Sequence, residues 1–315
     1  MVERRAGHPG PGGSVVTAAP ALAPGGLDAL ADIDPSTVDW PLARRATLLV
    51  HQWARYEYGG PVEDLRQRLV VFPPMRHGSQ RLVHHGLDVD GVPPDATHRW
   101  VDDFGNAHLE VHFRRVEQAV TFVTWSVVER VLGPGHRRPS PSGFTARLLR
   151  PTPLTRPNGA LRAIARDLRG RGLTGEALAR AACTEVHRRM AYAHDVTTVW
   201  TGAAAALAGG RGVCQDYAHI MIALCRTVGL PSRYVSGHLI GDAGSHAWVE
   251  VSVPHAGGAR VLALDPTHDR EAGPTYVTVA VGRDYADVPP FSGSYCAPHG
   301  NELRVGKRVA VLAVA

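Results

Sequence analysis

The sequence lacks the features that mark membrane proteins, exported proteins and calcium-binding proteins. None of its apolar runs is long enough to cross a bilayer. The stretch from Val15 to Ala23 is rich in alanine and proline but has no continuous apolar segment of the kind found in secretory signals. We therefore expect a cytoplasmic protein without a membrane partner. No acidic loop has the spacing of an EF-hand, so a calcium-dependent protein is not expected.

Cysteine and excess charge are also scarce. The cysteines Cys183, Cys214, Cys225 and Cys296 lie far apart and form no Cys-x-x-Cys pair. This spacing predicts neither a disulfide framework nor a structural zinc site, and it fits a reducing compartment. The formal net charge is only +5, and the arginines are scattered along the chain. A nucleic-acid partner is therefore not expected.

Composition changes along the chain and suggests two folded parts. With 315 residues and 44% hydrophobic content, the chain can bury one large core or two modest ones. Residues 1–38 are rich in glycine, alanine and proline, which predicts a disordered lead-in. Residues 39–132 predict a β-rich, sandwich-like N-terminal domain, and residues 133–157 a linker. The strands expected before the linker are Leu48–Tyr58, Gln67–Phe72, Arg81–Val89, Ala107–Arg114 and Val120–Val128.

The pattern becomes helical and then β again in a second predicted domain, residues 158–315. Helical spacing of apolar residues predicts helices after Asn158, after Thr174 and from Cys214. Helices followed by strands indicate an α+β fold class. The strands expected here are Arg233–Ile240, His246–Val253, Arg260–Leu264, Thr275–Val281 and Leu303–Val314.

Cys214 stands where a thiol can act as a nucleophile. It would begin a helix, where unpaired N–H groups and the positive end of the helix dipole favour a thiolate. Gly212 just before it lets the backbone turn closely and leaves room for a substrate. Cys183 and Cys225 lie on helices without such a glycine, and we expect them to be structural.

Two further residues complete a constellation with Cys214. His246 begins an alternating strand, and Asp265 ends the next strand before Pro266. Antiparallel pairing of these strands would let Asp265 orient the imidazole while its other nitrogen faces Cys214. Each residue alone is more often structural, but their order and context favour a nucleophile, a base and an orienting carboxylate.

The three residues stand in three short motifs, GVCQDYAH at residues 212–219, HAWVE at residues 246–250 and DPT at residues 265–267. These motifs resemble those of the bacterial transglutaminase-like family. The run at residues 281–288 and the turn Asp103-Phe104-Gly105-Asn106 also look familial. The resemblance covers roughly residue 46 to the C-terminus.

The resemblance implies a papain-like α+β core behind a β-rich N-terminal region. It also implies that Cys214 is the nucleophile, His246 the base and acid, and Asp265 the orienting group. One departure lies beside the third motif, where His268 stands in place of the usual asparagine and could alter a contact at the edge of the site.

The surroundings of the nucleophile leave several alternatives open. The backbone N–H of Cys214 is a natural oxyanion donor, and Trp200 is a candidate for the second donor or simply a packed aromatic. Gln215 and Asp216 could tune the field at the sulfur, although Asp216 could equally be an ordinary first-turn residue. Trp248 and the loop at residues 241–244 are candidates for a partial lid, or else a packed aromatic and a hairpin turn.

Together these features predict a cysteine acyltransferase or hydrolase that uses no metal and no cofactor. The expected substrate is an amide of a protein or peptide, either a glutamine side chain or a peptide bond. The thioester formed would pass its acyl group to a primary amine or to water. The alternatives are a cysteine peptidase or amidase, and a non-catalytic binding module on the same scaffold.

Overall fold

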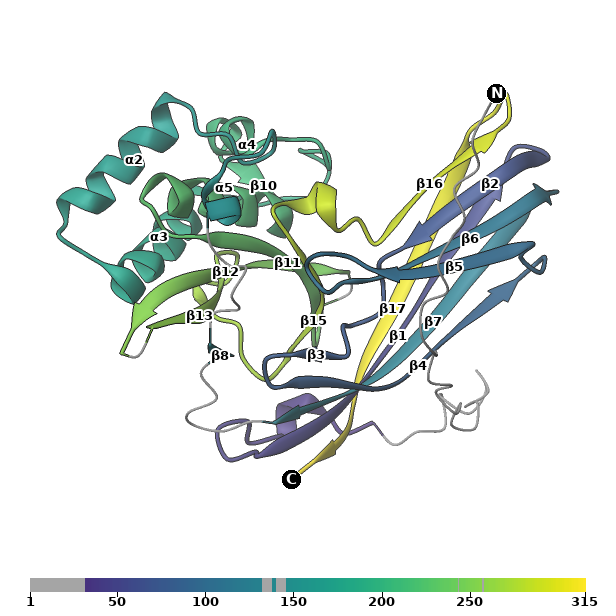
Figure 1. Ribbon diagram of the computed structural model, residues 1–315, viewed down its shortest axis with the longest axis horizontal. Coiled ribbons are helices and arrows are strands. Elements are labelled where there is room, and N and C mark those ends of the chain that lie inside the picture. The colour runs from purple at the N-terminus through teal and green to yellow at the C-terminus, as the bar shows by residue number, and fades with distance from the viewer. Residues whose placement is uncertain (1–31, 132–137, 140–145, 243, 257) are drawn as a thin grey trace, which may run out of the picture. The chain divides into compact units, whose positions relative to one another are not determined.

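Alternating apolar residues build two antiparallel sheets that pack face to face. In spatial order, one contains β17, β1, β7, β4 and β3, and the other contains β16, β2, β6 and β5 (Figure 1). Tyr58 and Phe122 from the first sheet are buried with Leu65 and Phe113 from the second, so the two sheets form a sandwich. The strands are β1 (Arg45–Tyr58), β2 (Val62–Leu69), β3 (Arg76–His77), β4 (Gln80–Asp90), β5 (Ala96–Val101), β6 (Ala107–Val116), β7 (Ala119–Val131), β16 (Phe291–Cys296) and β17 (Asn301–Val314).

The computed structural model describes residues 32–131, 138–139, 146–242, 244–256 and 258–315. Most of the predicted disordered lead-in, residues 1–31, therefore lies outside the described residues. The rest of it differs from the prediction, because Ile33 bridges Val311 and the Asp34 side chain caps a short 3₁₀ helix, Pro35–Thr37.

The last two strands belong to the sandwich although they follow every other element in the sequence. β16 pairs with β2, and β17 pairs with β1 along its whole length. The predicted division into residues 39–132 and 158–315 stays a prediction, but strands from both ranges share these sheets. β16 was not expected because its residues, FSGSYC, lack an apolar alternation.

A six-stranded antiparallel sheet and four helices form the other part of the fold. The sheet order is β14, β13, β12, β11 and β15, with β8 paired to β13. The helices lie on one face of β11 to β13 (Figure 1). The strands are β8 (Arg138–Pro139), β11 (Ser232–Leu239), β12 (His246–His255), β13 (Gly258–Asp265), β14 (Arg270–Glu271) and β15 (Tyr276–Gly282). The helices are α2 (Gly159–Gly170), α3 (Gly175–Arg189), α4 (Ala203–Gly209) and α5 (Cys214–Thr227), with short 3₁₀ turns at Ala146–Leu149 and Tyr285–Asp287.

Helix α5 is the centre of this part. Every residue from Gln215 to Arg226 is buried, because α2, α3 and α4 surround the helix and β12 covers its remaining face. The sequence predicts this arrangement of a helix bearing Cys214 on an antiparallel sheet. Helix α4 was not predicted, since its short run of alanines carries no helical pattern of large apolar residues. Among the described residues, no helix is both long and apolar enough to cross a membrane.

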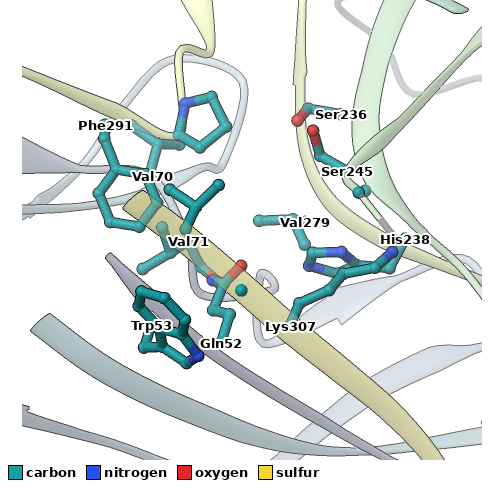
Figure 2. Close-up of a pocket in the computed structure, with 15 residues that line it drawn as sticks. Gln52, Trp53, Val70, Val71, Ser236, His238, Ser245, Val279, Phe291 and Lys307 are labelled. Carbon is teal, nitrogen blue, oxygen red and sulfur yellow. The ribbon is translucent and has the colours of Figure 1, made fainter. Parts of the chain in front are cut away.

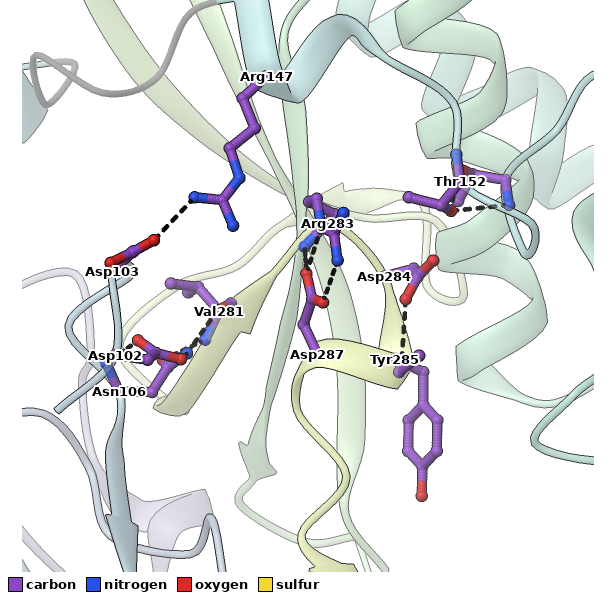
Figure 3. A network of polar contacts seen from close by, with 12 residues as sticks. Asp102, Asp103, Asn106, Arg147, Thr152, Val281, Arg283, Asp284, Tyr285 and Asp287 are labelled. Atoms are coloured by element: carbon purple, nitrogen blue, oxygen red, sulfur yellow. Dashed lines mark hydrogen bonds and ion pairs between the residues drawn. The ribbon is translucent and has the colours of Figure 1, made fainter. Parts of the chain in front are cut away.

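The turn at residues 102–106 ties the sandwich to the six-stranded sheet. The Asp102 carboxylate accepts the backbone N–H groups of Phe104 at 2.8 Å and Asn106 at 2.9 Å. The buried Asn106 amide then donates to the Val281 carbonyl and accepts from the Val281 N–H, both at 2.8 Å (Figure 3). Because β15 is the last strand of its sheet, the amide fills the place of a neighbouring strand and fixes the two sheets together.

Candidate active site

The start of α5 holds Cys214 at the surface of a rigid element. One Asp216 carboxylate oxygen accepts the Val213 N–H at 2.8 Å and the Thr197 hydroxyl at 2.7 Å. Burial raises the pKa of Asp216. A Cβ atom at position 212 would collide with that carboxylate, so Gly212 is required by the packing of the helix start. Cys214 itself is partly exposed, as an attacking group must be.

The structure brings His246 between the cysteine and the aspartate. His246 lies at the start of β12 and is 4% exposed. Its Nε2 donates to Asp265 Oδ2 at 2.8 Å, and Cys214 lies close enough to raise the pKa of the imidazole. Since Asp265 occupies Nε2, Nδ1 is the nitrogen left for the sulfur. Asp242 Oδ2 lies 3.5 Å from the same Nδ1.

Asp265 is held as a carboxylate by four donors. Oδ2 accepts from His246, from His268 Nδ1 at 2.7 Å and from the Tyr276 hydroxyl at 2.7 Å, while Oδ1 accepts the Thr267 N–H at 2.9 Å. Burial would raise its pKa, but these hydrogen bonds and the nearby imidazole keep the pKa well below its usual value. The departure at His268 therefore adds a donor to Asp265.

The contact between Asp265 and His246 lowers the pKa of the carboxylate and raises that of the imidazole. Burial would lower the pKa of His246, but the hydrogen bond to Asp265 and the charges of Asp265 and Cys214 raise it to about 9. The imidazole is thus held in its protonated form beside the sulfur at neutral pH. The imidazolium of His246 can therefore give its proton to a leaving amine once the Cys214 sulfur has attacked a carbonyl carbon.

The other residues predicted to line the site lie in different settings. Gln215 Nε2 donates to the Val199 carbonyl at 3.1 Å, so Gln215 and Asp216 both anchor the loop at residues 197–199 to the helix start. Trp200, in the same region, is 73% exposed, and the second oxyanion donor remains a prediction. Trp248 is buried beneath His246, with ring centroids 6.2 Å apart, and is therefore a packed aromatic and not a lid.

Several residues of the site were not found from the sequence. Tyr276 and Asp242 carry no motif, and only the fold brings them to Asp265 and His246. Tyr192 is half exposed on the short strand β9 (Ala191–Tyr192), which pairs with β10 (Arg211–Gly212) just before Cys214. Burial and the charge of Cys214 raise the pKa of Tyr192 to about 12.

The cluster around Asp265 also has the composition of a metal site. His246, Asp265 and His268 each offer a ligand atom, and these atoms all lie within 4.8 Å of one another. We expect catalysis without a metal, because hydrogen bonds to Oδ2 already engage both imidazoles. Activity should be unchanged after dialysis against EDTA. Loss of activity that zinc or calcium restores would contradict this expectation.

Cys214 should be the cysteine that reacts first with an alkylating reagent. Burial raises the pKa of Cys183 and raises that of Cys225 to about 12, so both thiols stay protonated and inaccessible. Cys296 is exposed but has no imidazole partner among the described residues. Sub-stoichiometric iodoacetamide at neutral pH, followed by peptide mapping, should label Cys214 first. Equal labelling of Cys296 would count against an activated thiol at Cys214.

Two family models and several relatives match the chain. Residues 162–266 match the family model of the transglutaminase-like superfamily, and residues 48–129 match that of the bacterial transglutaminase-like N-terminal region. An uncharacterized protein of Mycobacterium tuberculosis is 32% identical over 292 residues, covering 82% of this chain and 90% of the relative. An uncharacterized protein of Mycobacterium leprae is 30% identical over 244 residues, covering 71% and 85%.

A solved structure shares the fold. The crystal structure of a proposed cysteine protease from Cytophaga hutchinsonii matches with a TM-score of 0.70 at 20% identity, covering 86% of this chain and 92% of that chain. Its resemblance extends through both the sandwich and the helical part. The chain therefore belongs to the transglutaminase-like superfamily, with a papain-like α+β core and the β-rich N-terminal region of its bacterial members.

Proposed function

We propose that the protein is a cysteine acyltransferase or hydrolase that opens amides through a thioester on Cys214. Membership of the superfamily supports cysteine-based catalysis in general. The observation that carries the specific proposal is the position of His246, which is buried, hydrogen-bonded to Asp265 and close enough to Cys214 for the thiol to raise its pKa. A purely structural histidine would not need a partly exposed thiol on one side and a fully buried carboxylate on the other.

The chemistry divides into two half-reactions. In the first, the Cys214 thiolate attacks the amide carbonyl carbon, a C–S bond forms, and the C–N bond breaks as His246 gives its proton to the leaving amine. In the second, water or a primary amine attacks the thioester and passes a proton to His246, and the C–S bond breaks. The backbone N–H of Cys214, at the start of α5, can donate a hydrogen bond to the oxyanion formed in each half-reaction.

The choice between water and an amine depends on how closed the site is. Trp248 lies beneath His246 and cannot cover it. Near the start of α5, Tyr192 is half exposed and Trp200 is largely exposed. Transfer to an amine dominates only where a site excludes water or positions the acceptor. We therefore expect hydrolysis of simple glutamine peptides, and amine transfer only with an acceptor that fits.

The test is mass spectrometry of the protein after incubation with a library of glutamine-containing peptides. An acyl adduct on Cys214 is expected, and the released products show which bond was opened: a deamidated peptide indicates a side-chain amidase, and a shortened peptide indicates a peptidase. Cys296→Ala serves as the control because it removes an exposed thiol elsewhere. An adduct that persists in Cys214→Ala, or no adduct with any peptide, would rule the proposal out.

A panel of primary amines added to the reactive peptide separates transfer from hydrolysis. The ratio of amide product to acid product should be low with most amines and high with a few. If every amine at millimolar concentration gives mainly amide product, the open site inferred above is wrong.

A further inference from the structure

Lys307 is the only lysine among the 34 lysine and arginine residues of the sequence. It lies on β17, and its Nζ is inaccessible to solvent without a hydrogen-bond partner in the described part of the chain. An ammonium group removed from water without a partner is costly, so such groups are almost always paired or bind a ligand. The other residues of this set are all arginines, whereas this position carries a compact amine.

Lys307 faces a cavity of about 140 Å³ between the sandwich and the six-stranded sheet. On one side lie Lys307, His238 and Ser245, and on the other lie the apolar side chains of Val70 and Phe291 (Figure 2). A cavity of about 150 Å³ accommodates a molecule the size of benzene, so this one can hold a single side chain. One wall suits methylene groups, and the opposite wall suits a polar head.

His238 is a second unpaired group on the polar wall. It is 4% exposed, and neither ring nitrogen has a hydrogen-bond partner among the described residues. Burial and the nearby Lys307 lower the pKa of His238 to about 3, so the imidazole is neutral and offers one N–H donor. Burial lowers the pKa of Lys307 to about 8, opposed by the charges of Asp242 and Cys214, so the amine is mainly protonated at pH 7.

The cavity adjoins the Cys214–His246 pair. Ser245, which lines it, directly precedes His246, and Gly237, which also lines it, is the strand partner of His246. The charges of Asp242 and Cys214 both act on Lys307, where they oppose the lowering of its pKa by burial. A group bound in the cavity would therefore lie next to the amide that Cys214 attacks.

We propose that Lys307 and His238 form a subsite that binds a carboxylate of the substrate, next to the amide opened at Cys214. The ammonium and the imidazole N–H can each donate to one of the two carboxylate oxygens, and the methylenes behind the carboxylate pack on Val70 and Phe291. The position of the carboxylate relative to a scissile amide rests on the proposed function, while carboxylate binding itself does not. The carboxylate is either an acidic side chain or the α-carboxylate of a peptide C-terminus.

Binding can be measured without catalysis because the chain has one lysine. Cys214→Ala protein made with ¹³Cε-lysine gives a single lysine side-chain resonance. N-acetylglutamate α-amide presents an acidic side chain, N-acetylglutamine presents an α-carboxylate, and N-acetylglutamine amide presents neither. We expect a saturable shift with one of the first two probes and none with the third. No shift with either acid, or the same shift with the neutral amide, would overturn the subsite.

Kinetics then tests the place of the subsite in the reaction. The wild-type protein should prefer a peptide carrying a carboxylate near the amide over its neutral isostere by about 10–100-fold in kcat/KM. Lys307→Met should reduce this ratio to about 1. Arg304→Met removes a charge from the exposed surface of the same strand and should leave the ratio unchanged. A ratio retained in Lys307→Met would contradict the subsite. A lysine resonance that responds in a protein inactive on every peptide would instead support carboxylate binding and refute the proposed function.

Discussion

Replacing Asp265 with asparagine should lower kcat by about 10²–10⁴-fold while the protein remains folded. In the wild-type protein the carboxylate accepts His246 Nε2 at 2.8 Å and supports the charged imidazole. An asparagine keeps one oxygen for these donors but carries no charge, so the imidazolium loses its support. Steady-state kinetics on the peptide found by mass spectrometry would measure the effect.

The pH dependence of activity distinguishes a role of Asp265 in orienting His246 from a general disruption of the fold. The pKa of His246 is about 9 because Asp265 and Cys214 together outweigh its burial. Activity that needs the imidazolium should therefore be present below that value and fall as pH rises through it. Without the aspartate, burial lowers the pKa of His246. The pH at which activity falls on the alkaline side should therefore be lower in Asp265→Asn than in the wild-type protein. Asp269→Asn, four residues later and bonded to Thr184, is the matched control and should leave both kcat and this pH unchanged. A near wild-type kcat in Asp265→Asn would remove Asp265 from the mechanism.

Replacing Arg226 with methionine should destabilise the protein by about 3–5 kcal/mol. This buried side chain lies near the end of α5. It donates to the carbonyls of Leu148 at 2.9 Å, Ser232 at 3.0 Å and Arg283 at 2.6 Å, and to the Thr155 hydroxyl at 2.8 Å. Methionine preserves much of the apolar stem but leaves three carbonyls without this donor, those of Leu148 and Ser232 buried and that of Arg283 partly buried. Each buried carbonyl left unpaired costs about 1–3 kcal/mol before the structure relaxes.

Urea unfolding provides the measurement, with a lower midpoint expected at an unchanged slope. Arg169→Met is the matched control, since Arg169 donates to the Thr227 carbonyl from an exposed position at the same end of α5. That variant should lose no more than about 0.5 kcal/mol. Equal losses in the two variants would show that burial of the Arg226 network contributes little.

The elements that carry the site could be predicted because their signals are local. The Cys214 helix has a glycine before it and a sustained apolar pattern, and the strand from His246 alternates cleanly. The antiparallel pairing of β12 with β13, which the sequence order favours, brings Asp265 to His246. The motifs therefore indicate these three residues from the sequence alone.

Long-range pairing limited the rest of the prediction. Nothing local in β17 indicates that it pairs with β1, and nothing in β15 indicates that Tyr276 reaches Asp265. The alternation of residues along β12 predicts that Trp248 and His246 share one face of the strand. It does not predict that this face is buried around Trp248, because burial depends on which elements pack against it. Lys307 did leave a sequence signal, since it is the only lysine, but its meaning appears only when the cavity is visible.

The pairing of β1 with β17 bears on the order in which the chain can fold as it leaves the ribosome. Tyr58 pairs with Asn301, so 301 − 58 = 243 residues must be added after Tyr58 before its partner exists. During synthesis the first strand therefore presents an unpaired edge, which is a template for pairing with other chains. The sandwich can close only after the helical part has been made. Truncations that remove β17 should consequently yield aggregates rather than a stable core.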